Sequence, residues 1–130
     1  MSKEFKHKIR VYYEDTDSGG VVYYANYLKF LERARSEAIY SIGLSNRKLL
    51  NQYETLIIVK YCNIKYKKPA KLEDELDIIT KVKNFTRTSF TMLQKIMKNN
   101  EEISIAEIQL VTVNKRGKPV KIPEKLKNSL

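Results

Sequence analysis

The chain has 130 residues, 42% of them hydrophobic, and its 25 Lys and Arg residues outnumber its 15 Asp and Glu residues, a net charge of +10. This length predicts one globular domain over residues 1–130 and excludes two. Because a domain of this size keeps much of its surface exposed, it is unsuited to a deep enclosed cavity, and a ligand site shared between subunits is expected.

The first half of the chain is predicted to hold one strand, one loop and one long helix. Alternating hydrophobic residues predict a strand over residues 7–15, and residues 15–24 form a loop because two glycines and several small polar residues break regular structure. Hydrophobic residues recur at helical spacing over residues 27–42, which predicts a helix of about 17 residues. Phe30 widens this stripe, so the helix is expected to be buried, and Gly43 follows as its C-terminal cap.

The second half of the chain is predicted to be mainly β-structure. A short helix is predicted over residues 46–53, and four later segments have strand patterns: 55–66, 75–83, 87–97 and 103–114. Short turns between consecutive strands imply antiparallel pairing. The tail after residue 114 is expected to be irregular or a short edge element. The pattern predicts an α+β fold in which an antiparallel sheet of five to six strands packs against one long central helix.

The N-terminal segment and the cysteine content indicate the cellular compartment. No run approaches the roughly 20 apolar residues that a transmembrane helix needs, and residues 1–13 are charged and lack the apolar core of a signal peptide. Cys62 is the only cysteine. We therefore expect a cytoplasmic protein without membrane insertion. The positive charge is compatible with nucleic acid, with a phosphate-bearing molecule such as coenzyme A, and with a lysine-rich surface that binds nothing.

The sequence lacks the residues that several kinds of catalytic and metal site require. His7 is the only histidine, and nothing in the sequence pairs it with Cys62 or with a serine in a nucleophilic relay. There is no His/Cys cluster for zinc and no glycine-rich phosphate-binding motif. Residues 15–20, DTDSGG, resemble the start of a calcium loop, but Gly19 replaces an acidic ligand and Asn26 stands where the bidentate Glu is needed. No metal site is expected.

The carboxylates of Asp15 and Asp17 remain as candidates for chemistry, since two glycines and the start of the long helix, near Tyr24, follow them. A carboxylate can attack a thioester directly or activate a water for that attack. The start of a helix presents free N–H groups and a positive dipole end, which stabilise an oxyanion. Alternatively, Asp17 only makes a hydrogen-bonded turn beside the glycines. Residue types alone leave both interpretations open.

A resemblance to a known enzyme family is carried by residues 11–39, which read VYYEDTDSGGVVYYANYLKFLERARSEAI. They resemble the signature of the 4-hydroxybenzoyl-CoA thioesterase-like hot-dog enzymes, and most closely the branch linked to the bacterial Tol–Pal system. Weaker matches at residues 66–70, Asp74, residues 87–90 and residues 117–120 extend the resemblance over nearly the whole chain. It implies a hot-dog fold, acyl-CoA thioesterase activity and no cofactor, with coenzyme A as part of the substrate.

The resemblance also implies roles for individual residues. Asp17 matches the catalytic aspartate, a nucleophile or general base, and the Tyr24 backbone amide matches the donor that polarises the thioester carbonyl. Gly20 shapes the loop and adds a contact. Arg87 and Ser89 match positions where related enzymes contact coenzyme A. Apart from the resemblance, we expect basic residues to hold the nucleotide phosphates: Arg87, and Lys60, Lys65 or Lys67 from a partner subunit. Tyr24 departs from the Tol–Pal-linked branch, where histidine is usual, and agrees with the 4-hydroxybenzoyl-CoA branch, so the acyl group is not assigned.

Other interpretations remain compatible with the sequence. A second hot-dog subclass carries its carboxylate on the helix, where Glu32 and Glu37 are available, although ion pairs with the neighbouring Arg33 and Arg35 are expected instead. The substrate could be an acyl-carrier-protein thioester, or the protein could be a non-catalytic scaffold. Nucleic acid is not favoured, because five of the tyrosines cluster at the loop and helix and do not interleave with the lysines of residues 65–71: Tyr12, Tyr13, Tyr23, Tyr24 and Tyr27. Exposed sheet edges and the resemblance predict a homodimer or homotetramer that binds acyl-CoA.

Overall fold

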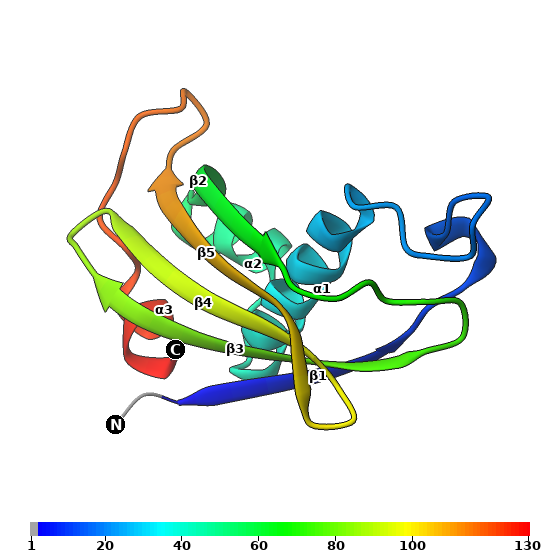
Figure 1. The fold of residues 1–130 in the computed structure, drawn as a ribbon. Helices are drawn as coiled ribbons and strands as arrows, with labels where there is room; N and C mark the ends of the chain where they lie inside the picture. The colour runs from blue at the N-terminus through cyan, green and yellow to red at the C-terminus, as the bar shows by residue number, and fades with distance from the viewer. Residues whose placement is uncertain (1–2) are drawn as a thin grey trace.

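One antiparallel sheet of five strands forms the body of the molecule (Figure 1). The computed structural model describes residues 3–130. Its strands are β1 (Glu4–Arg10), β2 (Leu56–Tyr66), β3 (Glu75–Phe85), β4 (Ser89–Lys98) and β5 (Glu101–Val113). They lie in the order β1-β3-β4-β5-β2 and every neighbouring pair is antiparallel, so β1 and β2 are the edge strands.

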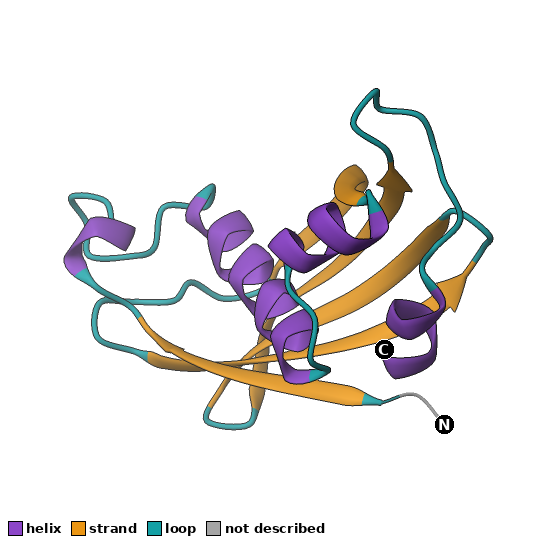
Figure 2. Ribbon diagram, turned by 180° about the vertical axis from the view of Figure 1, so that it is seen from behind, coloured by secondary structure: helices purple, strands orange, loops and turns teal. Residues whose placement is uncertain are grey.

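The long helix α1 (Asn26–Ser41) crosses one face of the sheet, and the shorter helix α2 (Asn46–Tyr53) lies on the same face (Figure 2). The side chains that α1 buries recur at helical spacing: Tyr27, Phe30, Leu31, Ala34, Ala38 and Ile39. Strand residues of the same core include Leu76, Ile78, Phe90, Met92 and Ile108. The predicted α+β arrangement, an antiparallel sheet against one long buried helix, is confirmed.

Helix α1 ends where the sequence predicted, because Gly43 adopts a φ of +84°, in the left-handed region that side chains disfavour. The Gly43 amide donates to the Tyr40 carbonyl (3.0 Å) and the Leu44 amide to the Ile39 carbonyl (3.2 Å). These bonds satisfy carbonyl groups that the last turn of a helix leaves free.

The first strand differs from its prediction at both ends. β1 covers Glu4–Arg10 rather than residues 7–15, and Tyr13–Asp15 forms a short 3₁₀ turn. There the Asp15 carboxylate accepts the Tyr12 amide (2.9 Å), a side-chain bond that closes a turn in place of a strand pairing. Hydrophobic alternation continues through this segment, so the pattern alone does not reveal where the strand stops.

The C-terminal tail also differs from its prediction, because it contains the helix α3 (Glu124–Ser129). Leu126 of this helix is fully buried in the main core, and this contact stabilises a helix that is too short to persist alone. None of the helices within residues 3–130 combines the length and the hydrophobicity needed to cross a lipid bilayer.

The two ends of the sheet carry different connections (Figure 1). At one end, here named the loop end, residues 11–25 meet the β2–β3 connection, residues 67–74. At the opposite end, the turn end, the β3–β4 turn lies beside the C-terminal tail, and the Ile122 amide donates to the Arg87 carbonyl (2.9 Å). β3 runs between the two ends over 11 residues, which corresponds to about 33 Å of extended chain.

Candidate active site

The loop that carries Asp17 is a tight hairpin at the loop end. Thr16 and Val22 form a β-bridge, the Asp17 amide donates to the Val21 carbonyl (2.9 Å), and the Gly20 amide donates to the Asp17 carbonyl (3.1 Å). Gly20 has a φ of +80°, which explains why glycine stands at this corner. The backbone of the hairpin is therefore fixed by its own hydrogen bonds.

The Asp17 carboxylate is exposed and only partly engaged. Its Oδ1 accepts the Gly19 amide (2.9 Å), so the hydrogen-bonded turn considered from the sequence is present. Its Oδ2 accepts no hydrogen bond from any residue between 3 and 130. The turn holds one carboxylate oxygen and leaves the other available, so the turn and a chemical role for Asp17 are compatible.

Asp15, by contrast, is buried and holds the local fold together. Its carboxylate accepts the Tyr12 amide (2.9 Å). Its carbonyl accepts the Tyr23 amide (3.0 Å) and the side-chain amide of Asn26 (2.8 Å). Asp15 thus ties the hairpin to the beginning of α1, and its burial separates it from the exposed Asp17 as a candidate for chemistry.

The beginning of α1 has two free backbone donors. Ala25 is the N-cap residue and makes no side-chain capping bond. The first turn is closed by the Tyr27 amide on the Tyr24 carbonyl (3.3 Å) and the Leu28 amide on the Ala25 carbonyl (3.2 Å). Within residues 3–130, the amides of Tyr24 and Ala25 have no acceptor. They project from the positive end of the helix dipole, as an anion-binding position requires.

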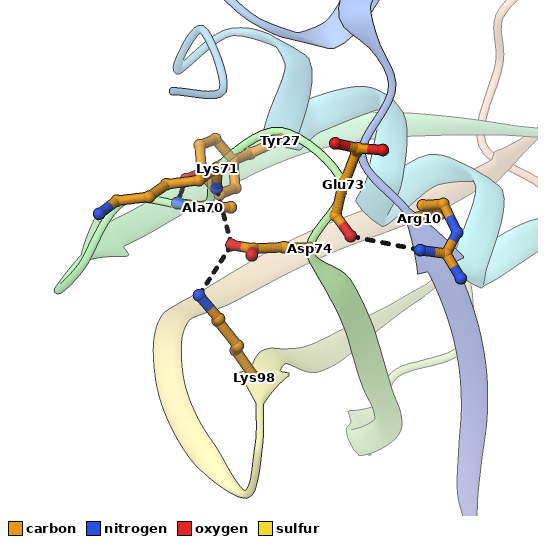
Figure 3. Close-up of polar contacts among 7 residues, drawn as sticks. All are labelled: Arg10, Tyr27, Ala70, Lys71, Glu73, Asp74 and Lys98. Carbon is orange, nitrogen blue, oxygen red and sulfur yellow. Dashed lines mark hydrogen bonds and ion pairs between the residues drawn. The ribbon is translucent and has the colours of Figure 1, made fainter. Parts of the chain in front are cut away.

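The β2–β3 connection holds both the hairpin and the helix (Figure 3). The Ala70 amide donates to the Tyr27 hydroxyl (3.0 Å) in a buried hydrogen bond. The Ala70 carbonyl accepts the Val22 amide (2.8 Å), and the Leu72 amide donates to the Gly20 carbonyl (3.0 Å). One short segment therefore sets the position of the Asp17 hairpin relative to α1.

The β2–β3 connection is itself anchored by Asp74 (Figure 3). Asp74 Oδ2 accepts the Lys71 amide (2.8 Å) and pairs with Lys98 Nζ (3.0 Å). The Arg10 guanidinium donates to the carbonyl of Glu73 (3.3 Å), a residue with a φ of +68°. The sequence did not predict these contacts, nor the hydrogen bond between Tyr27 and Ala70, because the pattern identified Tyr27 only as one member of the hydrophobic face of the helix.

Three tyrosine rings pack around the beginning of α1. Tyr66 makes edge-to-face contacts with Tyr24 (6.4 Å between centroids) and Tyr27 (5.1 Å), and its hydroxyl donates to the Tyr24 carbonyl (3.2 Å). Burial raises the pKa of Tyr27 and of Tyr66, so both hydroxyls keep their protons at neutral pH. The hollow beside them has a volume of about 270 Å³ and is lined by Val22, Tyr24, Tyr27, Tyr66, Lys67, Lys68 and Pro69.

A second hollow, of about 160 Å³, lies between α1, α2 and the sheet, with Ile57, Val59, Phe90 and Met92 among its apolar lining. Arg35 forms part of its wall and donates to Gln94 (3.0 Å); burial lowers the pKa of this guanidinium. The prediction that Glu32 and Glu37 form ion pairs was wrong: within residues 3–130 neither makes one. Glu32 instead accepts the Ser36 hydroxyl (2.8 Å).

The residues expected to hold coenzyme A do not all meet in one subunit. Lys67 lines the hollow at the loop end and pairs with Glu102. Lys60 is exposed at the bulge of the edge strand β2. Arg87 and Ser89 lie at the turn end, where the Ser89 hydroxyl is buried against Thr86 Oγ1 (2.6 Å). In one subunit, Asp17, Gly20, Tyr24 and Lys67 all lie at the loop end, whereas the other candidates lie elsewhere.

No metal-binding group is formed by the part of the chain that the structure describes: no three His, Cys, Asp or Glu side chains lie together there. The polar groups at the loop end include the exposed carboxylate of Asp17, the free backbone amides of Tyr24 and Ala25, and lysines such as Lys67 and Lys68. This set can bind and attack a carbonyl group whose oxygen acquires negative charge.

Comparison with known proteins gives consistent matches over the whole fold. The family model of the thioesterase-like superfamily matches residues 11–130. The acyl-CoA thioesterase YbgC of Haemophilus influenzae is 38% identical over 128 residues, covering 98% of this chain and 94% of that protein. The acyl-CoA thioester hydrolase YbgC of Escherichia coli O6:H1 is 36% identical over 124 residues, with coverages of 94% and 92%.

Solved structures agree with these matches. A probable thioesterase from Bartonella henselae superimposes with a TM-score of 0.90 at 32% identity, covering 93% of this chain and 100% of that one. The Synechocystis protein Slr0204, a 1,4-dihydroxy-2-naphthoyl-CoA thioesterase, has the same fold, with a TM-score of 0.90 at 20% identity and coverages of 98% and 95%. The chain therefore belongs to the thioesterase-like superfamily and has the hot-dog fold of its thioesterases.

Proposed function

We propose that this member of the thioesterase-like superfamily hydrolyses an acyl-CoA thioester to the free acid and coenzyme A. The similarity to the YbgC acyl-CoA thioesterases supports the reaction class. The observation that carries the proposal is that an exposed carboxylate, Asp17, lies at the same end of the fold as a helix start whose Tyr24 and Ala25 amides are free.

In the proposed reaction, the thioester oxygen lies at the beginning of α1 and accepts the Tyr24 amide. Asp17 either attacks the carbonyl carbon, so that an anhydride forms and water then cleaves it, or removes a proton from the attacking water. In both routes the carbon–sulfur bond breaks, and the thiolate of coenzyme A takes up a proton. The helix dipole favours the negative charge that develops on the carbonyl oxygen.

Two subunits are proposed to build each complete site, as a homodimer or homotetramer. The edge strand β2 has 11 residues and exposes apolar side chains: Leu56, Ile58, Val59 and Tyr61. An unpaired apolar edge of this length favours pairing with a second copy. Because an isologous pairing of two β2 strands is antiparallel, it places the turn end of one subunit beside the loop end of the other.

This arrangement would bring Arg87 and the backbone around Ser89 toward the partner's Asp17. Lys67 comes from the subunit that supplies Asp17, and Lys60 lies on the paired edge itself. Arg and Lys contacts to the phosphates of coenzyme A are charge-assisted and strengthen binding. They lie away from the bond that breaks, so their loss is expected to raise KM more than it lowers kcat.

The test is hydrolysis of a panel of short, long and aromatic acyl-CoA thioesters, followed with a thiol reagent, by the wild type and by Asp17→Asn. Loss of the nucleophile or base should reduce kcat by about 10²–10⁴-fold. Glu14→Gln is the matched control, because Glu14 is an exposed carboxylate in the same segment and should leave kcat unchanged. Near-normal turnover by Asp17→Asn would refute the mechanism, and a wild type inactive on every thioester would refute the function.

Adding an acyl-carrier-protein thioester to this panel tests the alternative substrate. If an acyl-carrier-protein thioester is cleaved much faster than the coenzyme A thioester of the same acid, the carrier protein is the substrate, and the basic surface is its docking site. Equal or faster cleavage of the coenzyme A thioester supports the proposal.

A further inference from the structure

Tyr66 connects the sheet to the Tyr24 carbonyl, which lies just before α1. It is the last residue of β2, and its hydroxyl donates to the Tyr24 carbonyl (3.2 Å). Its ring stands between those of Tyr24 and Tyr27 in edge-to-face contacts. The contact spans 42 positions of sequence, so it is a tertiary contact and not part of the local helix geometry.

The Tyr24 carbonyl belongs to the peptide group whose amide is that of Ala25, one of the two free donors. A peptide group is planar, so fixing the direction of its carbonyl also fixes the direction of its N–H. A hydrogen bond to the carbonyl also polarises the amide at the other side of the same peptide group. The Tyr66 hydroxyl therefore orients and strengthens a donor at the helix start.

The neighbouring peptide group is held in the same way by the backbone. The Asn26 amide donates to the Tyr23 carbonyl (2.8 Å), which leaves the Tyr24 amide free on the other side. In the peptide group between Tyr24 and Ala25, the carbonyl accepts the Tyr27 amide over a longer distance, 3.3 Å. Ala25 supplies no side-chain cap, and the Tyr66 hydroxyl is a side-chain donor to the carbonyl of the peptide group that carries the Ala25 amide.

Tyr66 is well placed to act as a fixed support. The amides of Lys67 and Lys68 both donate to the Ile103 carbonyl (2.9 and 3.2 Å), which pins the end of β2 to β5. The Tyr27 ring, on which Tyr66 rests, is held by its buried bond to Ala70. The raised pKa of Tyr66, caused mainly by burial, keeps its hydroxyl protonated as a donor.

We propose that Tyr66 is a positioning residue for thioester hydrolysis, whose hydroxyl aligns the free amide of Ala25 as a second donor to the thioester oxygen, beside the Tyr24 amide. The inference rests on the proposed function, in which the free amides at the helix start stabilise the oxyanion. Donors at an oxyanion position act through pre-alignment in the transition state, so the contribution of Tyr66 should affect kcat and leave substrate binding almost unchanged.

The experiment compares Tyr66→Phe with the wild type on the best acyl-CoA of the panel. Removing the hydroxyl and keeping the ring should lower kcat about tenfold and change KM less than about twofold, the effect of one misaligned hydrogen bond. The shape of the pH–rate profile should be unchanged, because Tyr66 transfers no proton. Tyr40→Phe is the matched control: Tyr40 is 50% exposed, close to the 47% of Tyr66, and lies at the far end of α1.

The outcomes are separable. An unchanged kcat in Tyr66→Phe overturns the inference, and so does a rise in KM alone, which would make Tyr66 a binding residue. Loss of one limb of the pH profile also overturns it, because Tyr66 would then be an acid or base. A fall in kcat accompanied by a lower melting temperature would point to a structural role only. If Asp17→Asn is inactive and Tyr66→Phe is normal, only this inference fails; an inactive wild type removes the proposed function as well.

Discussion

The hydrogen bond between the Tyr27 hydroxyl and the Ala70 amide should contribute measurably to stability. Both residues are buried, at 3% and 0% exposure, and the bond length is 3.0 Å. Tyr27→Phe keeps the ring and opens no large cavity, so its main effect is to leave the Ala70 amide buried without an acceptor. An unsatisfied buried amide costs about 1–3 kcal/mol.

The expected change in melting temperature follows from chain length. Unfolding entropy is about 2.1 cal/mol/K per residue, so for 130 residues a loss of about 2 kcal/mol corresponds to about 7 °C. The assay is thermal unfolding followed by circular dichroism at one fixed protein concentration, because oligomerisation shifts the melting temperature. Tyr40→Phe, an exposed position on the same helix, should change the melting temperature by about 1 °C or less.

Hydrogen exchange supplies a local measurement of the same effect. The Ala70 amide should exchange faster in Tyr27→Phe than in the wild type, because the opening of the β2–β3 connection becomes easier. A melting temperature within about 1 °C of the wild type, together with unchanged exchange at Ala70, would refute the conclusion that this bond holds the β2–β3 connection to α1.

Three further predictions follow from the site and the sheet edge. Gly20→Ala should lower kcat and cost about 1 kcal/mol, because Gly20 has a φ of +80° with open space around it; Gly117→Ala, at a φ of +79° with equally open space, should cost the same stability and leave kcat unchanged. Burial raises the folded-state pKa of Tyr27 above 10.0, so the stability that Tyr27 contributes should be complete below about pH 10 and decline above it. Denaturant unfolding at pH 9 and pH 11 should therefore show a smaller loss of stability for Tyr27→Phe than for the wild type. Ile58→Lys on the β2 edge should produce monomers in light scattering, whereas Lys8→Gln on the β1 edge should not, and an unchanged oligomer for Ile58→Lys would contradict the proposed interface.

Local patterns in the sequence predicted much of the fold. Helix α2 occupies residues 46–53 as expected, and the β4–β5 turn falls at Asn99 and Asn100, whose φ values of +49° and +65° suit asparagine. These features depend on a few adjacent residues. The end of β1 and the helix α3 depend on contacts of Asp15 and Leu126, and hydrophobic periodicity carries no information about either contact.

The sequence predicted less of the candidate site than of the fold. Asp17 and Tyr24 were selected by family resemblance, whereas residue types alone left Asp17 open between chemistry and a turn. The contacts of Tyr66 with Tyr24 and of Tyr27 with Ala70 join residues about 40 positions apart, which no local sequence pattern predicts. One signal was present: Ala25 occupies the N-cap, where Ser, Thr, Asp or Asn usually satisfies the free amides.

The proposed division of the site between the two ends of the sheet connects the proposed catalysis to the proposed assembly. In one subunit, Asp17 and Tyr24 lie at the loop end and Arg87 lies at the turn end, with β3 running between them. If the β2 edges pair in antiparallel fashion, each loop end gains the partner's turn end, and two complete sites form from two incomplete ones. A monomeric Ile58→Lys variant would keep Asp17 and the helix amides and lose only the partner's contacts. Its KM for acyl-CoA should therefore rise more than its kcat falls, and an unchanged KM in a proven monomer would place the whole site within one subunit.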